Sequence, residues 1–367
     1  MKRTNIRYIF FGAILFALIG VLIFVRMDSK SQLKNQIYQQ WKKNYVVEQN
    51  DTAYVKTTND KDQDVVLSES QGYGMVAAVE AAKKSQAEQK DFEKLYNYYL
   101  AHRMEGTQLM SWRQTVKDGV VSDEANNATD GDLYIAYALI QAAKLWSKNA
   151  EAYETQAKAI LNDILTHNYN ETEGILTVGN WATADSKFHH LMRTSDVLPA
   201  QFQAFYKLTG NDQWLKIKES MLAKLEKASV DYKTGLLPDF IWVENGTVRA
   251  AEKNAIASKN DGDYYYNACR LPYNLAQSKD AKSQKILNKM MKFFMKQQRI
   301  YAGYTLDGKA LNQYQSASFI APIFYAANRN TDYLKLVQQN KYLFMQDLPT
   351  ENYYEAALIT LAALETL

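Results

Sequence analysis

The amino-acid sequence predicts an all-α fold in which at least ten helices close into one helical ring, or toroid. Glycine and proline are scarce, with 15 and 5 of 367 residues, against roughly 7% and 5% in an average protein. Sandwiches and barrels of strands need many turns rich in these residues, so an all-β fold is disfavoured. Apolar residues also recur at the helical period along most of the chain, without the tight sequence repeat that builds a solenoid.

The helical segments, taken in chain order, run from residue 75 almost to the end. Periodicity predicts helices over 75–84, 91–103, 133–146, 150–167, 200–208, 214–228, 281–298, 316–328, 331–339 and 353–365. Runs with strand character occur at 65–67, 175–178 and 236–243, and they are short enough to be loop hairpins. No low-complexity linker divides this body. We therefore expect one helical domain over 48–367, preceded at 26–47 by a polar amphipathic helix that forms either a stalk or the first helix.

The beginning of the chain predicts a membrane anchor. Residues 8–25 form an uncharged apolar run of 18 residues that follows Lys2, Arg3 and Arg7. As a helix this run would span about 27 Å, close to the hydrocarbon thickness of a bilayer. It lacks the small-residue cleavage site of a signal peptide. We expect an uncleaved signal anchor in the cell membrane, with residues 1–7 in the cytoplasm and the remainder outside it.

Composition excludes several other classes of function. The 43 basic and 40 acidic residues give a net charge of +3 and form no basic stripe, so we expect no nucleic-acid partner. The single cysteine, Cys269, excludes a disulfide framework and a cysteine-based zinc site. The four histidines lack the spacing of metal ligands. We therefore expect neither a metal nor a cofactor.

A first glycine-rich motif, SESQGYGM, begins at Ser68. The capping-box spacing of Ser68 and Gln71 predicts a helix with Ser68 as its N-cap and Glu69 at its first position. Gly72 and Gly74 then lie in the opening turns of that helix, where each costs about 1 kcal/mol relative to alanine. We therefore expect another part of the chain to approach this backbone closely.

A second motif, ATDGDL, has similar features around Asp130. Thr129 and Asp132 again have capping spacing, which places Asp130 at the first position of the next predicted helix. A lone acid at such a position is usually a solvated carboxylate that the helix dipole stabilises. Two such acids beside unusual glycines and aromatic residues make a functional role the better interpretation.

Together these motifs resemble the signatures of glycoside hydrolase family 8. SESQGYGM is similar to the family's general-acid segment, ATDGDLYIAYALIQAAKLW to its second signature, and LMSWR at 109–113 to its sugar-binding tryptophan stretch. RTSD at 193–196 and DGDYYYNACRLP at 261–272 also match, and the resemblance runs from about residue 48 to the C-terminus. It implies an (α/α)6 barrel and an inverting, endo-acting hydrolase of a β-linked polysaccharide such as cellulose, mixed-linkage β-glucan, xylan or chitosan.

The resemblance also implies roles for individual residues. An inverting glycosidase needs a protonated acid on the leaving oxygen and a base that activates water across the sugar ring. Glu69 matches the acid, and Asp130 matches the residue that binds the distorted sugar. Aromatic candidates would stack on sugar faces, and an arginine would pair with a carboxylate of the site or form a structural ion pair. The substrate-binding candidates are Tyr73, Trp112, Trp181, Tyr264, Tyr266, Asn267 and Arg270.

The base is where this sequence departs from the family. One branch carries Asp where this chain has Asn267, and a neutral amide cannot deprotonate water. A second branch has Asn there and takes its base from a Glu that aligns with Ala257. The remaining candidates for the base are Glu252, Asp261, Asp263 and Asp196.

Two hypotheses about function follow. The first is a membrane-anchored, extracellular, glucanase-like hydrolase that acts by general acid and base catalysis. The second is a catalytically impaired glycan-binding subunit of a polysaccharide synthase or export complex.

Overall fold

The computed structural model describes Phe16, Met27 and residues 29–367. Apart from Phe16, the anchor predicted at 8–25 lies outside the described residues. Along the described part of the chain, no helix combines the length and the apolar character needed to cross a membrane.

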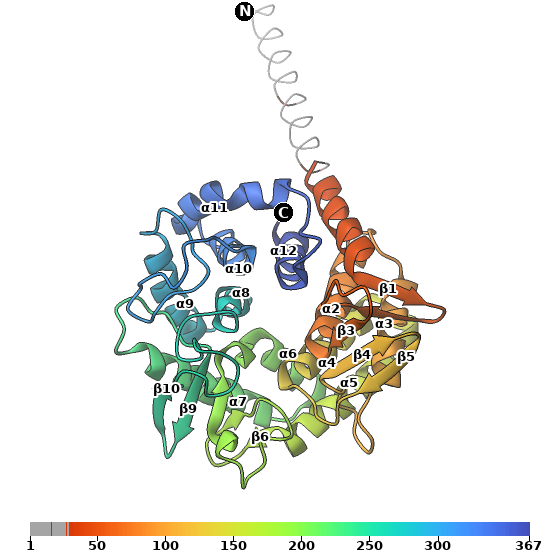
Figure 1. Ribbon diagram of the computed structural model, residues 1–367, viewed down its shortest axis with the longest axis horizontal. Coiled ribbons are helices and arrows are strands. Elements are labelled where there is room, and N and C mark those ends of the chain that lie inside the picture. Colours follow the sequence, from red (N-terminus) through yellow and green to blue (C-terminus); the bar gives the residue numbers. More distant parts are fainter. Residues whose placement is uncertain (1–15, 17–26, 28) are drawn as a thin grey trace, which may run out of the picture.

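Twelve α-helices of the described chain alternate between an inner and an outer ring (Figure 1). The inner helices contact one another in chain order, and the last contacts the first, which closes the ring. Five of the outer helices each lie against an inner neighbour. This arrangement is an (α/α)6 barrel. The inner helices are α2 (Ser68–Ala82), α4 (Thr129–Leu145), α6 (Pro199–Thr209), α8 (Leu271–Ala276), α10 (Ala317–Ala327) and α12 (Tyr353–Thr366). The outer helices are residues 29–45, α3 (Gln89–Ala101), α5 (Ala150–His167), α7 (Gln213–Ser229), α9 (Ala281–Phe294) and α11 (Leu334–Asn340).

The pattern of buried residues along each helix explains whether the helix lies in the inner or the outer ring. Outer helices are amphipathic, as in α9, where Ile286, Met290 and Phe294 are buried along one face. Inner helices are apolar or small on nearly every side, as in α12, where ten of fourteen residues are buried. A helix that is apolar all round needs neighbours on every side, so these segments can only form the inner ring.

The helix at 29–45 packs against α12. Trp41 and Tyr45 are buried, and both rings lie against the ring of Tyr353, with centroids 6.0 and 6.2 Å away. The Lys34 ammonium donates a hydrogen bond of 2.9 Å to the carbonyl of Leu364. Of the two sequence interpretations of this segment, stalk and first helix, the structure shows the first helix of the ring.

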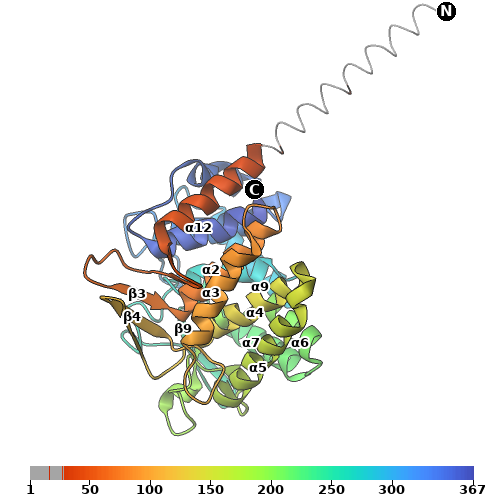
Figure 2. The same ribbon diagram turned by 90° about the vertical axis from the view of Figure 1, so that its right-hand side faces the viewer.

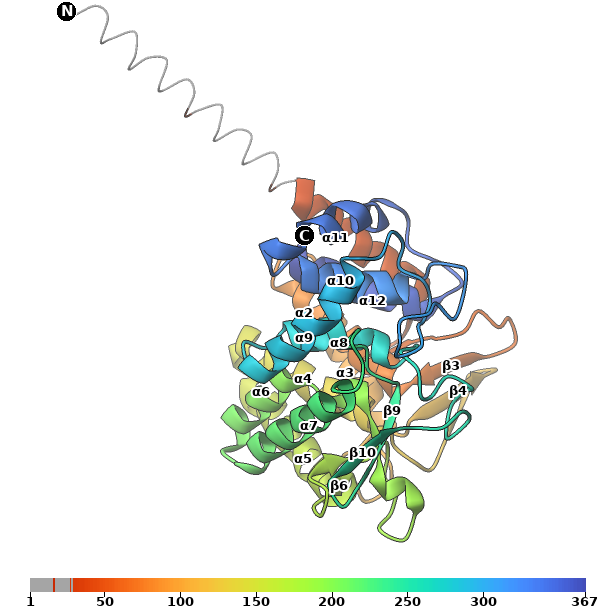
Figure 3. The same ribbon diagram turned by 90° about the vertical axis from the view of Figure 1, so that its left-hand side faces the viewer.

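The prediction of an all-α chain was incomplete, because short antiparallel strands gather at one end of the ring (Figures 2 and 3). One sheet contains β3 (Asp64–Leu67), β4 (Arg113–Lys117) and β5 (Val120–Asp123), and another contains β8 (Leu191–Arg193), β9 (Phe240–Glu244) and β10 (Thr247–Ala250). Two hairpins are β1 (Val46–Gln49) with β2 (Thr52–Val55) and β6 (Tyr169–Asn170) with β7 (Ile175–Leu176). The strand-like runs at 65–67, 175–178 and 236–243 overlap β3, β7 and β9, whereas the other strands were missed because each is too short to show an alternating pattern.

Candidate active site

The first turns of α2 and α4 touch, and glycines make this contact possible. A Cβ atom on Gly72 would lie 2.7 Å from Cβ of Tyr134, and one on Gly131 would lie 2.6 Å from the backbone carbon of Ser68. Real Cβ atoms do not approach this closely. Glycine is therefore required at these positions, despite its cost in a helix, because the two helices cross closely there. This crossing places Glu69 and Asp130 side by side.

The two predicted capping boxes are wrong. Ser68 and Thr129 are the first helical residues, and the residue before each is the N-cap. The side chains that were expected to cap these helices form hydrogen bonds with other segments instead. Gln71 bonds to backbone groups of neighbouring segments, and Asp132 accepts the backbone N–H of Met110 at 2.8 Å. Glu69 and Asp130 are consequently second residues of their helices.

A cavity of about 220 Å³ opens at these helix starts. Glu69 and Asp130 line it together with Trp112, whose carbonyl accepts the backbone N–H of Ser68 at 3.0 Å. This bond fixes the tryptophan beside the start of α2. Other lining residues include Arg193, Phe240, Ile256, Ala257 and Asn267. Predicted site residues that are far apart in the sequence thus meet in one cavity.

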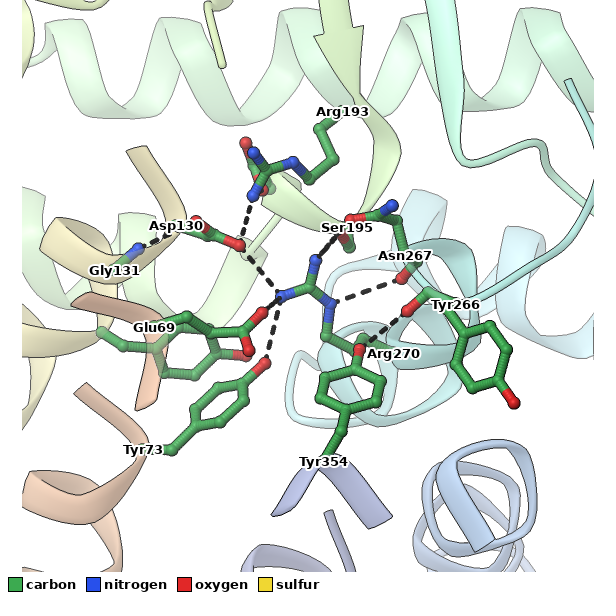
Figure 4. Close-up of polar contacts among 12 residues, drawn as sticks. Glu69, Tyr73, Asp130, Gly131, Arg193, Ser195, Tyr266, Asn267, Arg270 and Tyr354 are labelled. Carbon is green, nitrogen blue, oxygen red and sulfur yellow. Dashed lines mark hydrogen bonds and ion pairs between the residues drawn. The ribbon is translucent and has the colours of Figure 1, made fainter. Parts of the chain in front are cut away.

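One buried guanidinium joins the two acids (Figure 4). Arg270, in the 3-10 turn η4 (Ala268–Arg270), is only 2% exposed. Its Nη1 donates to Oε2 of Glu69 at 2.7 Å, to Oδ2 of Asp130 at 3.0 Å and to the hydroxyl of Tyr73 at 3.1 Å. Its Nη2 donates to Oγ of Ser195 at 2.7 Å and to Oδ1 of Asn267 at 3.1 Å. Arg270 therefore fixes the relative positions of the acids.

The environments of the two acids move their pKa values in opposite directions. Burial raises the pKa of the Glu69 carboxyl, and the negative charge of Asp130 adds to this, although Arg270 opposes it. Burial also disfavours the charge of Asp130, but Arg193 and Arg270 outweigh it and hold the pKa of this carboxyl below its ordinary range. One carboxyl is thus suited to hold a proton while the other stays ionised, the pattern expected of distinct acid and charge-stabilising roles.

Two residues at the acids were not predicted. Arg193 forms an ion pair with Asp130 through Nη1, and the only signal for it was its place in the RTSD motif. Tyr353, at the start of α12, donates its hydroxyl to Oε1 of Glu69 at 3.3 Å. No motif marks that tyrosine, because it reaches the site only when α12 closes the ring.

Asp239 was also missed, and it holds the segment that leads to Arg270. Its buried carboxylate accepts backbone N–H groups from Tyr265, Asn267 and Ala268 at 2.9, 3.0 and 2.7 Å. Burial raises the pKa of Asp239 to about 6 despite these bonds. Asp239 lies in the loop before β9, so no motif spacing connects it with the site.

The predicted tyrosines differ in position. Tyr73 is buried with its ring edge against Tyr134, centroids 4.7 Å apart, so only its hydroxyl reaches Arg270 and it cannot stack on a sugar. Tyr264 is fully buried away from the cavity, because its ring packs against Phe294 and Phe319 in the core. These two expectations of stacking are corrected.

The remaining aromatic candidates occupy three different settings. Trp112 is 38% exposed where it lines the cavity. Trp181 packs edge-on against Phe188 at 5.2 Å in a small satellite core and does not line the cavity. Tyr266 packs against Phe319 at 5.1 Å, and its carbonyl accepts the Tyr354 hydroxyl at 2.7 Å (Figure 4). Of these, only Trp112 presents its side chain to the cavity.

None of the four candidate bases lines the cavity, and three of them have no contact with the acids. Asp261 is buried and accepts the backbone N–H groups of residues 256, 257 and 258 at 2.8–3.0 Å, so it holds a loop. Glu252 is exposed and accepts a hydrogen bond from Trp242. Asp263 is half-buried behind that loop. The structure does not bring these three carboxylates to the acids.

Asp196, the fourth candidate, lies close to the acids but beneath the surface. It is 0% exposed, and its Oδ1 is 3.8 Å from Nη1 of Arg193. Burial raises its pKa to about 7, and Asp130 adds to the rise while Arg193 and Arg270 oppose it. Asp196 therefore belongs to the charged network of the site without lining the cavity.

Comparison with known proteins agrees with this geometry. The sequence profile of the family described as "Glycosyl hydrolases family 8" matches residues 13–366. A β-glucanase of Niallia circulans is 32% identical over 315 residues, which cover 82% of this chain and 75% of that protein. An endoglucanase of Bacillus sp. (strain KSM-330) is 29% identical, covering 84% and 70%. The structure of a β-1,3-1,4-glucanase from Paenibacillus sp. X4 superposes with a TM-score of 0.81 at 27% identity, covering 92% and 91%. The chain therefore belongs to glycosyl hydrolase family 8 and is a glucanase-like glycosidase that hydrolyses O-glycosyl bonds.

Proposed function

We propose that this protein is an inverting, endo-acting hydrolase of β-linked glucan with Glu69 as its general acid and Asp130 as the ionised residue that binds the sugar next to the scissile bond. The observation that carries the proposal is the arrangement of the two acids. They share one nitrogen of Arg270, yet their pKa values are displaced in opposite directions.

The hydrogen bonds around Glu69 support its role as the proton donor. Arg270 can only donate, so it occupies Oε2 of Glu69. The proton of the neutral acid then lies on Oε1, which still has a lone pair for the Tyr353 hydroxyl at 3.3 Å. In the reaction, this proton passes to the glycosidic oxygen as the bond from that oxygen to the anomeric carbon breaks. Water adds to the anomeric carbon from the opposite face of the sugar and gives an inverted product. The proton that this water loses passes to solvent, from which Glu69 is protonated again.

The substrate class is supported by the cavity and by the relatives. Trp112 offers an exposed aromatic face at the cavity, and such faces pack against the apolar faces of sugar rings. Relatives at 27% identity or more carry the names β-glucanase, endoglucanase and β-1,3-1,4-glucanase. We therefore propose a soluble mixed-linkage β-glucan as the first substrate to examine.

The test is a digestion series with reducing-end detection on mixed-linkage β-glucan, carboxymethyl-cellulose, xylan and chitosan. We expect turnover of mixed-linkage β-glucan and a loss of at least about 1000-fold in Glu69→Gln, since the proton donor is removed. Glu151→Gln, an exposed acid in the first turn of α5, is the matched control and should keep full activity. Absence of turnover on all four polymers by the unmutated protein would refute the proposed hydrolase.

A second candidate function is glycan binding with little or no turnover. It is favoured by one observation: among the described residues that line the cavity, the only carboxylates are Glu69 and Asp130. The opposite wall carries Ala257 and Asn267, and neither side chain can take a proton from water. Binding of a glucan oligosaccharide without release of reducing ends would establish this alternative.

We also propose that the protein is held at the outer face of the cell membrane by residues 8–25, with 1–7 in the cytoplasm. The length of this apolar run and the basic residues before it support the proposal. Fractionation of cells that express the full chain, or a chain beginning at residue 29, provides the test. The full chain should sediment with membranes and the shortened chain should not; sedimentation of both would contradict an anchor at 8–25.

A further inference from the structure

Asp196 has an unusual environment for a buried carboxyl group. It ends the 3-10 turn η3 (Thr194–Asp196) and is 0% exposed. Neither of its oxygens accepts a hydrogen bond from any residue that the structure describes. Buried carboxyl oxygens nearly always have such partners, and leaving them without one is costly. A second arrangement of the site in which these oxygens have a donor would remove that cost.

The donor that would match Asp196 is beside it. Arg193 directs Nη1 to Asp130, while its buried Nε–H finds no acceptor among the described residues. The same Nη1 is 3.8 Å from Oδ1 of Asp196, beyond hydrogen-bond distance. A guanidinium fork binds a carboxylate through two parallel hydrogen bonds. Two free carboxyl oxygens therefore lie beside a guanidinium that still has a free N–H group.

Asp130, by contrast, has one oxygen, Oδ2, that two guanidinium groups already saturate. Oδ2 of Asp130 is paired with the guanidinium groups of both Arg193 and Arg270, and Oδ1 accepts the backbone N–H of Gly131 at 3.1 Å (Figure 4). A sugar hydroxyl that donates to Oδ2 must therefore displace one of the guanidinium groups. Arg270 is held by further bonds to other residues, whereas Arg193 lines the cavity and, among the described residues, has only the 3.8 Å contact with Asp196 besides its ion pair with Asp130. Arg193 is therefore the group free to move.

We propose that Asp196 is a positioning residue that receives the Arg193 guanidinium when a sugar takes its place on Asp130. This inference rests on the proposed binding of glucan in the cavity, but it holds whether or not the glucan is then cleaved. In the free protein Arg193 neutralises Asp130. In the complex Arg193 pairs with Asp196 and leaves Asp130 to the sugar.

The transfer has a measurable consequence, the release of a proton. The charged groups that face Asp196 are Arg193 from β8, Asp130 from α4, Arg270 from η4 and Glu69 from α2. In the free protein the pKa of Asp196 is about 7, so the carboxyl is mostly protonated at pH 6. A closely paired guanidinium lowers the pKa of a carboxyl, so docking of Arg193 would expel this proton. By linkage, affinity then rises with pH up to about 7 and levels off above it.

Titration calorimetry of a mixed-linkage glucan tetrasaccharide, in two buffers of different ionisation enthalpy, counts the protons released. Glu69→Gln serves as the background because it prevents hydrolysis and removes the carboxyl with a raised pKa that lines the cavity. We expect about one proton released at pH 6 and close to none at pH 9. Adding Asp196→Asn should abolish the release at pH 6. Arg193→Gln, which keeps the carboxyl and removes the moving group, should abolish it too, so a fold defect in one variant does not decide the matter.

The outcomes separate the two proposals. Binding with no proton release at pH 6 in the Glu69→Gln background overturns the transfer of Arg193 and leaves the glucan site intact. Equal release with and without Asp196→Asn overturns it as well. Failure of the tetrasaccharide to bind overturns this inference together with the proposed function.

Discussion

Gly131→Ala tests whether the close contact of α2 and α4 creates the site. The added Cβ would lie 2.6 Å from the backbone carbon of Ser68 and would also overlap the Ser68 hydroxyl. Cβ atoms essentially never come within 3.0 Å of another heavy atom, and the atom in the way is backbone, which no rotamer change can move. The start of α2 must therefore shift by a few tenths of an ångström, and Glu69 shifts with it relative to Asp130.

The size of the effect follows from two independent terms. Overpacking of a well-packed contact costs about 1–3 kcal/mol of unfolding free energy. A displacement of about 1 Å between reacting groups can cost about 100-fold in rate, so a smaller shift predicts a fall in kcat/KM of about 10- to 100-fold. The assay is reducing-end release from mixed-linkage β-glucan, with thermal unfolding measured on the same samples.

Gly119→Ala is the matched control for Gly131→Ala. Gly119 lies in the turn between β4 and β5 with φ of +78°, and nothing lies within 4 Å of its added Cβ. Forcing alanine into this left-handed conformation costs about 1–2 kcal/mol without touching the site. We expect a similar loss of stability and no loss of kcat/KM. Full activity in Gly131→Ala, or equal losses of activity in both variants, would refute the argument.

Three further predictions concern the cavity, the arginine between the acids, and pH. Trp112→Ala should raise KM about fivefold with little change in kcat, since a stacking contact is worth about 1 kcal/mol; a fall in kcat alone, measured on the same glucan, would contradict it. Arg270→Met should lower the unfolding free energy by about 3–5 kcal/mol in a denaturant titration, because it leaves Glu69 and Asp130 buried without their shared donor; an unchanged midpoint would be inconsistent with that role. Burial raises the pKa of Asp132 to about 8, against about 4 in an unfolded chain, so the folded state holds a proton that the unfolded state releases and stability falls as pH rises from 4 to 8. Asp132→Asn should therefore show a smaller fall in thermal midpoint between pH 5 and pH 8.5 than the unmutated protein, and parallel curves would speak against this assignment.

The positions of most helices could be predicted because their apolar period is long and regular. The helix at Ala150–His167 begins and ends at the residues that the pattern indicated. The helix α8 was missed because its six residues, LPYNLA, span less than two turns and carry no period. The helix starts were misjudged at Ser68 and Thr129, where polar side chains in capping positions bond instead to distant backbone groups.

Within the site, motif residues were predictable and supporting residues were not. Glu69, Asp130, Trp112, Asn267 and Arg270 lie in compact motifs, and the fold brings them to one cavity and its buried guanidinium. Tyr353 and Asp239 contribute through contacts across 284 and 28 residues of sequence, which only the closed ring and its loops create. Tyr264 was expected at the sugar because it lies within a matched motif. Its backbone instead pairs with Tyr304 in an antiparallel bridge, and its ring is buried in the core.

In the proposed reaction, Glu69 donates the proton in an inverting cleavage of β-glucan. Proton NMR of the first product formed from mixed-linkage β-glucan tests this most directly, since the anomeric signal records the configuration before mutarotation. The α anomer should appear first, and no product should appear with Glu69→Gln under the same conditions. Initial formation of the β anomer, or α product from Glu69→Gln at the unmutated rate, would contradict the account.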